Sequence, residues 1–198
     1  MPTRVPRHLF RELNRLILYG FPVCAVLAGV LLTTASVMTP PETFKKMSLS
    51  SSAFKDGQPI PAQYTCEGKN TSPPLSWQGT PAGTQCLVLI VDDPDSPSGV
   101  FTHWVVFNLP ADTYELPENF SKSPAGAATA LQGLNDFKQT GYGGPCPPAG
   151  KAHRYYFKLF ALDTTLDAAA GAARKEIEAA MTKHILAAGQ LMGTYHRK

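Results

Sequence analysis

Hydrophobic positions in residues 48–198 fall mainly into short runs separated by clusters of Gly, Pro, Asn and Asp, a pattern typical of β-strands joined by turns. The segment from Gln85 to Val91 is continuously apolar from Cys86 onward and predicts a strand buried on both faces. Two more strands are predicted at Val100 to Leu109 and at His153 to Leu162. The fold class is therefore mainly β.

Side chains alternate between the two faces of a strand, so the sequence also predicts which residues share a face. In each of the strands at Val100 to Leu109 and His153 to Leu162, a histidine near the start shares one face with apolar residues. These predicted faces are Phe101, His103, Val105 and Phe107, and His153, Tyr155, Phe157 and Leu159.

One segment has helical rather than strand periodicity. Residues 167–188 place Ile177, Met181, Ile185 and Ala188 on one stripe, with Asp167 as a candidate cap. We expect this C-terminal helix to pack on the core, with a final strand at residues 190–196.

The N-terminal pattern differs again. Residues 16–37 contain no charged residue and follow the arginines Arg4, Arg7, Arg11 and Arg15. Such a segment is typical of a secretory signal, but a membrane span needs only about 20 apolar residues, so an uncleaved anchor is the alternative. We therefore divide the chain into 1–38 (signal peptide or anchor), 39–47 (linker) and 48–198 (folded domain). The domain is expected to be periplasmic or secreted, or anchored in the inner membrane if the segment is not cleaved.

The net charge of the predicted domain differs from that of the whole chain. The whole chain carries a net charge of +3. Residues 48–198 hold 12 Lys and Arg against 13 Asp and Glu, which is a net charge of −1. The domain thus lacks the basic excess that binding to a nucleic-acid backbone requires.

The four cysteines have different surroundings. Cys24 lies in the N-terminal hydrophobic run, and Cys86 opens the apolar run of a predicted strand, where it is expected to be a buried small hydrophobe. Cys66 and Cys146 lie in Gly- and Pro-rich loops, and an oxidising compartment would pair them. From the spacing alone, two free thiols remain the alternative.

Candidate chemistry is concentrated in two segments, each of which places a proline-stiffened loop beside a strand-borne histidine. The first is Asp93-Pro94-Asp95-Ser96-Pro97 followed by His103-Trp104, and the second is Gly144-Pro145-Cys146-Pro147-Pro148 followed by Gly150 and His153-Arg154-Tyr155. Neighbouring strands would bring two imidazoles, a carboxylate and a phenol to one pocket.

These segments resemble the two signature regions of the phosphatidylethanolamine-binding protein family, the Raf-kinase-inhibitor-like proteins. The D-P-D-x-P…H-W and G-x-P-P-x-G-x-x-H-R-Y patterns occur in the same order, and Asn70-Thr71-Ser72-Pro73 and Trp77 add to the resemblance. In having no long insertions, the chain is similar to the compact, exported bacterial branch of this family. Ser96 stands where alanine is commonest in the motif.

The resemblance implies a β-sheet sandwich with few peripheral helices and a small pocket for anions such as phosphate or a phosphorylated headgroup. It also strengthens the pairing of Cys66 with Cys146 as a disulfide. No cofactor and no metal are implied, whereas homodimerisation and inhibition of a kinase or protease are. The implied ligand-binding residues are Asp93, Asp95, His103, Gly144, Cys146, Pro148, His153 and Tyr155.

Chemistry assigns roles within this set. Charged imidazoles, a tyrosine hydroxyl and loop N–H groups are donors for an anion, while Asp93 is expected to hydrogen-bond a histidine ring or to receive the ammonium of an ethanolamine group. Arg154 alternates to the opposite strand face and is expected to be structural. The sequence thus predicts a binding protein without turnover. One alternative is a hydrolase or a metal-assisted enzyme that uses the same His/Asp cluster, although no G-x-S-x-G or H-x-x-x-H motif is present. Another is an interaction protein in which the pocket is vestigial.

Overall fold

The computed structural model describes residues 45–122 and 130–197. The predicted signal peptide or anchor, the linker up to residue 44 and Cys24 lie outside these residues. Within the described residues, no helix is long and apolar enough to cross a membrane.

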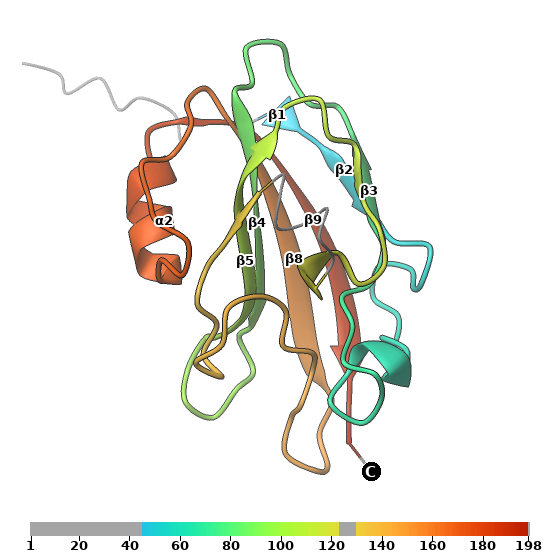
Figure 1. Ribbon diagram of the computed structural model, residues 1–198. Helices are drawn as coiled ribbons and strands as arrows, with labels where there is room; N and C mark the ends of the chain where they lie inside the picture. The colour runs from blue at the N-terminus through green and yellow to red at the C-terminus, as the bar shows by residue number, and fades with distance from the viewer. Residues whose placement is uncertain (1–44, 123–129, 198) are drawn as a thin grey trace, which may run out of the picture. The chain divides into compact units, whose positions relative to one another are not determined.

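The fold is a sandwich of two β-sheets, as predicted (Figure 1). The larger, six-stranded sheet has the order β1-β9-β8-β4-β5-β7, and the smaller, three-stranded sheet has the order β2-β3-β6. Figure 1 shows β2 and β3 on one side of the larger sheet and the helix α2 on the other. The strands are β1 Lys45–Lys46, β2 Ser48–Ser50, β3 Leu75–Gln78, β4 Cys86–Asp93, β5 Phe101–Pro110, β6 Glu115–Leu116, β7 Leu131–Gln132, β8 His153–Leu162 and β9 Ile185–Tyr195; the short helices are η1 Ala62–Tyr64, η2 Phe120–Lys122 and α2 Arg174–Met181.

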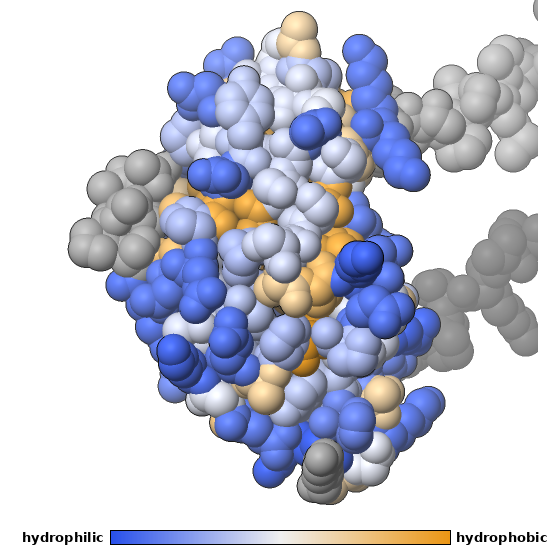
Figure 2. All heavy atoms as spheres, turned by 90° about the vertical axis from the view of Figure 1, so that its right-hand side faces the viewer, coloured by the Kyte–Doolittle hydropathy of each residue, from blue (hydrophilic) through white to orange (hydrophobic). Residues whose placement is uncertain are grey.

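Apolar residues of both sheets form the main core. Leu49 and Trp77 from the smaller sheet belong to the same buried cluster as Leu89, Phe157 and their neighbours in the larger sheet. A second cluster on the opposite face of the larger sheet packs under α2. Seen from the side of the smaller sheet, the surface is largely polar, with apolar side chains visible across its middle (Figure 2).

β4 lies inside the larger sheet, between β8 and β5, and all eight of its residues are buried, as the continuous apolar run predicted. It pairs antiparallel with β5 on one side and with β8 on the other. The predicted strand His153–Leu162 is confirmed, and the other two long predicted strands are confirmed with their ends shifted by a residue or two.

The predicted long C-terminal helix is wrong. Only Arg174–Met181 is helical, the residue before it makes no side-chain capping bond, and Asp167 therefore does not cap it. Ile185 and Ala188 belong instead to β9. The four-residue spacing that joins Met181 to Ile185 runs across a turn, in which the N–H of His184 bonds the carbonyl of Met181 at 2.9 Å.

The predicted face of β5 is also wrong, because this strand contains a bulge. Trp104 is opposite Val91 and Thr102 is opposite Asp92, so His103 has no partner of its own on β4. A bulge sets two residues against one and interrupts the alternation of side chains. His103 consequently lies on the same face as Trp104, whereas Val105 and Phe107 lie in the second cluster, under α2.

Candidate functional site

A small pocket lies where β4, β5 and β8 meet the loops that follow or precede them. Its volume is about 120 Å³. A water molecule occupies roughly 30 Å³ in the liquid, so the pocket accepts a small ion or a headgroup rather than an extended molecule. It is lined by Asp93, Ser96, Pro97, Phe101, His103, Phe137, Cys146, Pro147, Pro148 and His153.

His103 reaches this pocket because of the bulge in β5. Its side chain is bonded through Nδ1 to the carbonyl oxygen of Gly143 at 2.6 Å, and the N–H of Gly143 returns a bond to the His103 carbonyl at 2.9 Å. A carbonyl only accepts, so Nδ1 carries the proton. Burial lowers the pKa of His103, and the bond to Gly143 offsets part of that effect.

His153 begins β8 and pairs with a carboxylate. Its Nδ1 lies 2.7 Å from Oδ2 of Asp93, and both residues are buried. The other oxygen of Asp93 accepts the backbone N–H of Asp95 at 2.8 Å. The predicted hydrogen bond between Asp93 and a histidine ring is therefore present, and it fixes the orientation of the imidazole.

Tyr155 lies beneath the pocket rather than in its wall. Its ring contacts that of His103 with a centroid distance of 5.1 Å, and its buried hydroxyl makes no hydrogen bond of ordinary geometry among the described residues, although the Asp93 carboxylate lies near it. Burial raises the pKa of Tyr155, and the negative charge of Asp93 acts in the same direction. The hydroxyl thus stays protonated and remains a donor.

Besides Tyr155, two more of the expected ligand-binding residues, Asp95 and Gly144, do not line the pocket. Both carboxylate oxygens of Asp95 bond the side chain of Arg154, at 2.7 and 2.9 Å. The N–H of Gly144 donates to Oδ1 of Asn70 at 2.7 Å. Asp95 and Gly144 therefore hold the surrounding loops, and Arg154 is structural, as expected.

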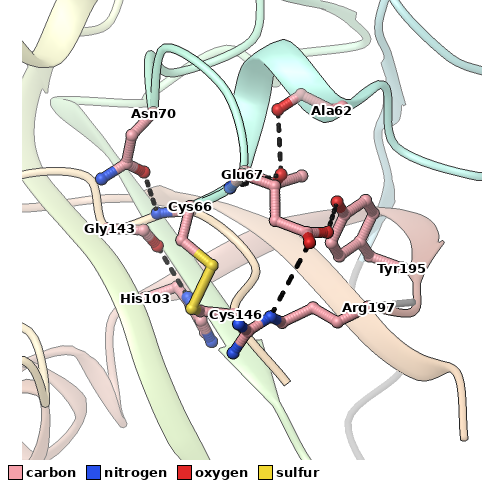
Figure 3. The surroundings of a disulfide bond; sticks show 11 residues. Ala62, Cys66, Glu67, Asn70, His103, Gly143, Cys146, Tyr195 and Arg197 are labelled. Atoms are coloured by element: carbon pink, nitrogen blue, oxygen red, sulfur yellow. Dashed lines mark hydrogen bonds and ion pairs between the residues drawn. A yellow bond between two sulfur atoms is a disulfide. The ribbon is translucent and has the colours of Figure 1, made fainter. Parts of the chain in front are cut away.

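A disulfide between Cys66 and Cys146 ties the rim of the pocket to the loop after η1 (Figure 3). The two Cα atoms are 5.4 Å apart, which confirms the predicted pairing. The N–H of Cys66 also bonds the carbonyl of Pro145 at 3.1 Å. The remaining cysteine of the described residues, Cys86, is buried as predicted.

The residue after the disulfide extends this support to the end of β9. Figure 3 shows Glu67 between Tyr195 and Arg197. The hydroxyl of Tyr195 donates to the Glu67 carboxylate, and Arg197 lies 3.9 Å from its other oxygen. The pocket rim is thus fixed to the sheet through the disulfide loop.

Sequence reasoning missed part of the pocket wall. Phe137 comes from the loop after β7, and its ring lies 4.8 Å from that of Phe101 and 5.4 Å from that of His103. No periodicity marks this loop residue, so no sequence signal could have found it. Ser96, Pro97 and Pro147, in contrast, lie within the two segments already singled out, and their neighbours pointed to them.

Metal ligands are not gathered at this site. Within residues 45–122 and 130–197, no group of three or more His, Cys, Asp or Glu side chains is arranged to hold a metal ion. The polar groups of the pocket are instead two imidazoles, one carboxylate and the hydroxyl of Ser96.

Comparisons with known proteins agree with this architecture. Residues 50–196 match the family model described as phosphatidylethanolamine-binding protein. A UPF0098 protein of Methanothermobacter thermautotrophicus is 49% identical over 151 residues, which cover 76% of this chain and 99% of the relative. One from Aquifex aeolicus is 50% identical over 153 residues, covering 76% of this chain and 89% of the relative.

Solved structures give the same result. A putative phosphatidylethanolamine-binding protein homologue from Chlamydia trachomatis superimposes with a TM-score of 0.70 at 42% identity, covering 78% of this chain and 99% of that one. E. coli YbcL, described as a new member of the mammalian family, superimposes with a TM-score of 0.73 at 32% identity, covering 77% of this chain and 99% of that one. Motifs, fold and relatives agree, and the chain belongs to the phosphatidylethanolamine-binding protein family.

Proposed function

We propose that this chain is an exported binding protein that holds a small anion, phosphate or a phosphorylated headgroup, in the pocket between Asp93, His103 and His153. The observation that carries the proposal is the arrangement of the two histidines. In each, Nδ1 is occupied, by Gly143 in one case and by Asp93 in the other. The nitrogen left for a ligand in each ring is Nε2.

The shape and surroundings of the pocket support a small polar ligand. Its volume of about 120 Å³ suits a phosphoryl group. Ser96 adds a hydroxyl, and the rings of Phe101 and Phe137 exclude water from one side. Hydrogen bonds to a charged group are stronger in such a sheltered place than in water.

Binding without turnover is the simpler chemistry for this cluster. A hydrolase would need a nucleophile hydrogen-bonded to the imidazole that activates it. Among the described residues that line the pocket, Cys146 is engaged in a disulfide and the Ser96 hydroxyl lies 3.1 Å from that of Ser98. The pair Asp93–His153 is accordingly assigned to ligand binding.

Export is supported by the disulfide, because such bonds persist in oxidising compartments. The proposed location is the periplasm or the extracellular space, with membrane attachment through residues 16–37 if that segment is retained. Kinase or protease inhibition and homodimerisation belong to the same proposal, as roles implied by the family.

Calorimetric titration of the purified full-length chain with inorganic phosphate and with phosphoethanolamine tests the binding function. His103→Ala and His153→Ala should each weaken binding by roughly tenfold or more, because each removes a hydrogen bond to a charged group. His184→Ala is the matched control, since this exposed histidine bonds Asp163 away from the pocket. Wild-type affinity in both pocket variants would refute the assignment, and ester turnover lost in the same variants would favour the hydrolase.

A further inference from the structure

The two pocket histidines differ in what holds them, and this difference has a chemical consequence. Nδ1 of His153 faces a carboxylate, whereas Nδ1 of His103 faces a carbonyl. Only the first ring has a negative partner that can balance a positive charge. The inference below rests on the proposed anion site and concerns which anion that site selects.

His103 is held as a neutral ring. It is 3% exposed, and a charge buried that deeply needs a paired counter-charge. The nearest carboxylates, Asp93 and Asp136, are committed elsewhere, the first to His153 and the second to the N–H of Thr102 at 2.7 Å. With its proton on Nδ1, a neutral His103 presents Nε2 as a lone pair, which accepts a hydrogen bond and cannot donate one.

The opposite wall of the pocket supplies donors. Asp93 lies 2.7 Å from Nδ1 of His153 and is the counter-charge that this ring needs in order to offer an Nε2–H to an anionic ligand. The Ser96 hydroxyl also lines the pocket, and if its oxygen accepts from the Ser98 hydroxyl, its own hydrogen is left for a ligand. One side of the pocket therefore donates hydrogen bonds to a ligand, and the His103 side accepts one.

We infer that this pocket selects a phosphate that carries its own proton, either inorganic phosphate or a phosphomonoester with a P–O–H group. The phosphoryl oxygens accept from His153 and Ser96, while the P–O–H group donates to Nε2 of His103. Sulfate and phosphodiesters have no such proton. Either of these anions would place an oxygen lone pair against the lone pair of His103 in a buried site, which is costly.

Competition between matched anions tests this selectivity. Titrations of the full-length chain at about pH 6, where roughly half of a phosphomonoester still carries its proton, compare phosphate with sulfate and phosphoethanolamine with glycerophosphoethanolamine. We expect the proton-bearing member of each pair to bind at least about tenfold more tightly, which is the cost of one unpaired buried acceptor. The second pair also separates a free phosphomonoester from the diester found in a lipid headgroup.

The outcomes separate this inference from the function on which it depends. Equal affinity for phosphate and sulfate, within about twofold, would overturn the selectivity and leave anion binding intact. Equal affinity for the phosphodiester would do the same and would indicate a lipid headgroup as the ligand. Absence of binding to all four probes would overturn both the selectivity and the proposed function.

Two variants assign the selectivity to one nitrogen. In His103→Asn the side-chain amide keeps a donor for the Gly143 carbonyl but has no atom at the position of Nε2, so the preference for phosphate over sulfate should fall towards one. In Ser96→Ala a donor is lost for every anion, so both affinities should fall and their ratio should stay. A preference that survives in His103→Asn would refute the role of His103.

Nitrogen NMR of wild-type protein saturated with phosphate provides a measurement that needs no variant. Nε2 of His103 should have the chemical shift of an unprotonated ring nitrogen and Nδ1 that of a protonated one. A doubly protonated His103 in the complex would overturn the inference.

Discussion

Removal of the disulfide by the double substitution Cys66→Ser and Cys146→Ser tests how the pocket rim is held. The bridge joins residues with a sequence separation of 80. For a closed loop of that length, the chain-entropy model assigns about 4.5 kcal/mol of stabilisation at 25 °C. Cys66 is exposed and Cys146 is half-buried, so the serines add little desolvation cost of their own.

Urea denaturation followed by circular dichroism measures this loss. With an m-value of about 2 kcal/mol/M, the midpoint should fall by roughly 2 M. Wild-type protein treated with dithiothreitol should converge on the double variant, and the double variant itself should not respond to the reductant. Because Cys146 lines the pocket, the affinity for phosphate should fall in both. A loss of less than about 1 kcal/mol would refute the reasoning, since the unfolded chain would then not be constrained by this loop.

Three further substitutions test other parts of the site. Gly144→Ala should lose about 2–3 kcal/mol of unfolding free energy in urea melts, because its Cβ would lie 2.3 Å from the carbonyl oxygen of Tyr64. The control Gly83→Ala has open space around the added Cβ and should cost only about 1 kcal/mol, for its positive φ. Equal losses in the two variants would contradict the clash. The guanidinium of Arg154 holds the pKa of Asp95 well below its usual value, so this pair contributes stability above about pH 4 that is lost as the pH falls. The Asp95→Asn variant should therefore lose less unfolding free energy than wild type when the pH is lowered from about pH 5 to pH 3. Parallel plots of unfolding free energy against pH for the two proteins would contradict this. Tyr155→Phe should keep its stability within about 1 kcal/mol in the same melts, because the hydroxyl makes no hydrogen bond of ordinary geometry and only lies near the Asp93 carboxylate; a larger loss would show that the two groups are hydrogen-bonded.

Where the local sequence pattern and the tertiary structure agree, the sequence was sufficient to predict the element and its bounds. β8 alternates between apolar core residues and outward-facing ones, and its predicted bounds match the structure. The prediction of a helix around Ile185 was wrong because there the local pattern and the tertiary structure disagree. The apolar spacing of the segment fits a helix, but Gly189 approaches the backbone of Met47 so closely that an added Cβ would lie 2.8 Å from the Met47 carbonyl. The segment is a strand because it pairs with β8 on one side and with β1 on the other, and β1 lies far away in the sequence.

The candidate site was predictable in its chemistry and not in its geometry. Proline-stiffened loops beside histidines located His103, His153, Asp93 and Cys146, whereas Cys66 was located by its own Gly- and Pro-rich loop. The bulge that brings His103 to the pocket face was invisible, because a strict alternation would have turned this side chain under α2. The aromatic wall from Phe137 was equally hidden, since it depends on how a loop folds back over β5.

The central position of β4 also constrains how the chain folds. Its neighbour β5 follows after a short turn, but its other neighbour, β8, is synthesised only after several further segments. Until β8 arrives, one edge of a long strand whose first six residues are all apolar is open to pairing with another molecule. We therefore expect docking of β8 to compete with aggregation during folding, so that the yield of refolded protein falls as the protein concentration rises.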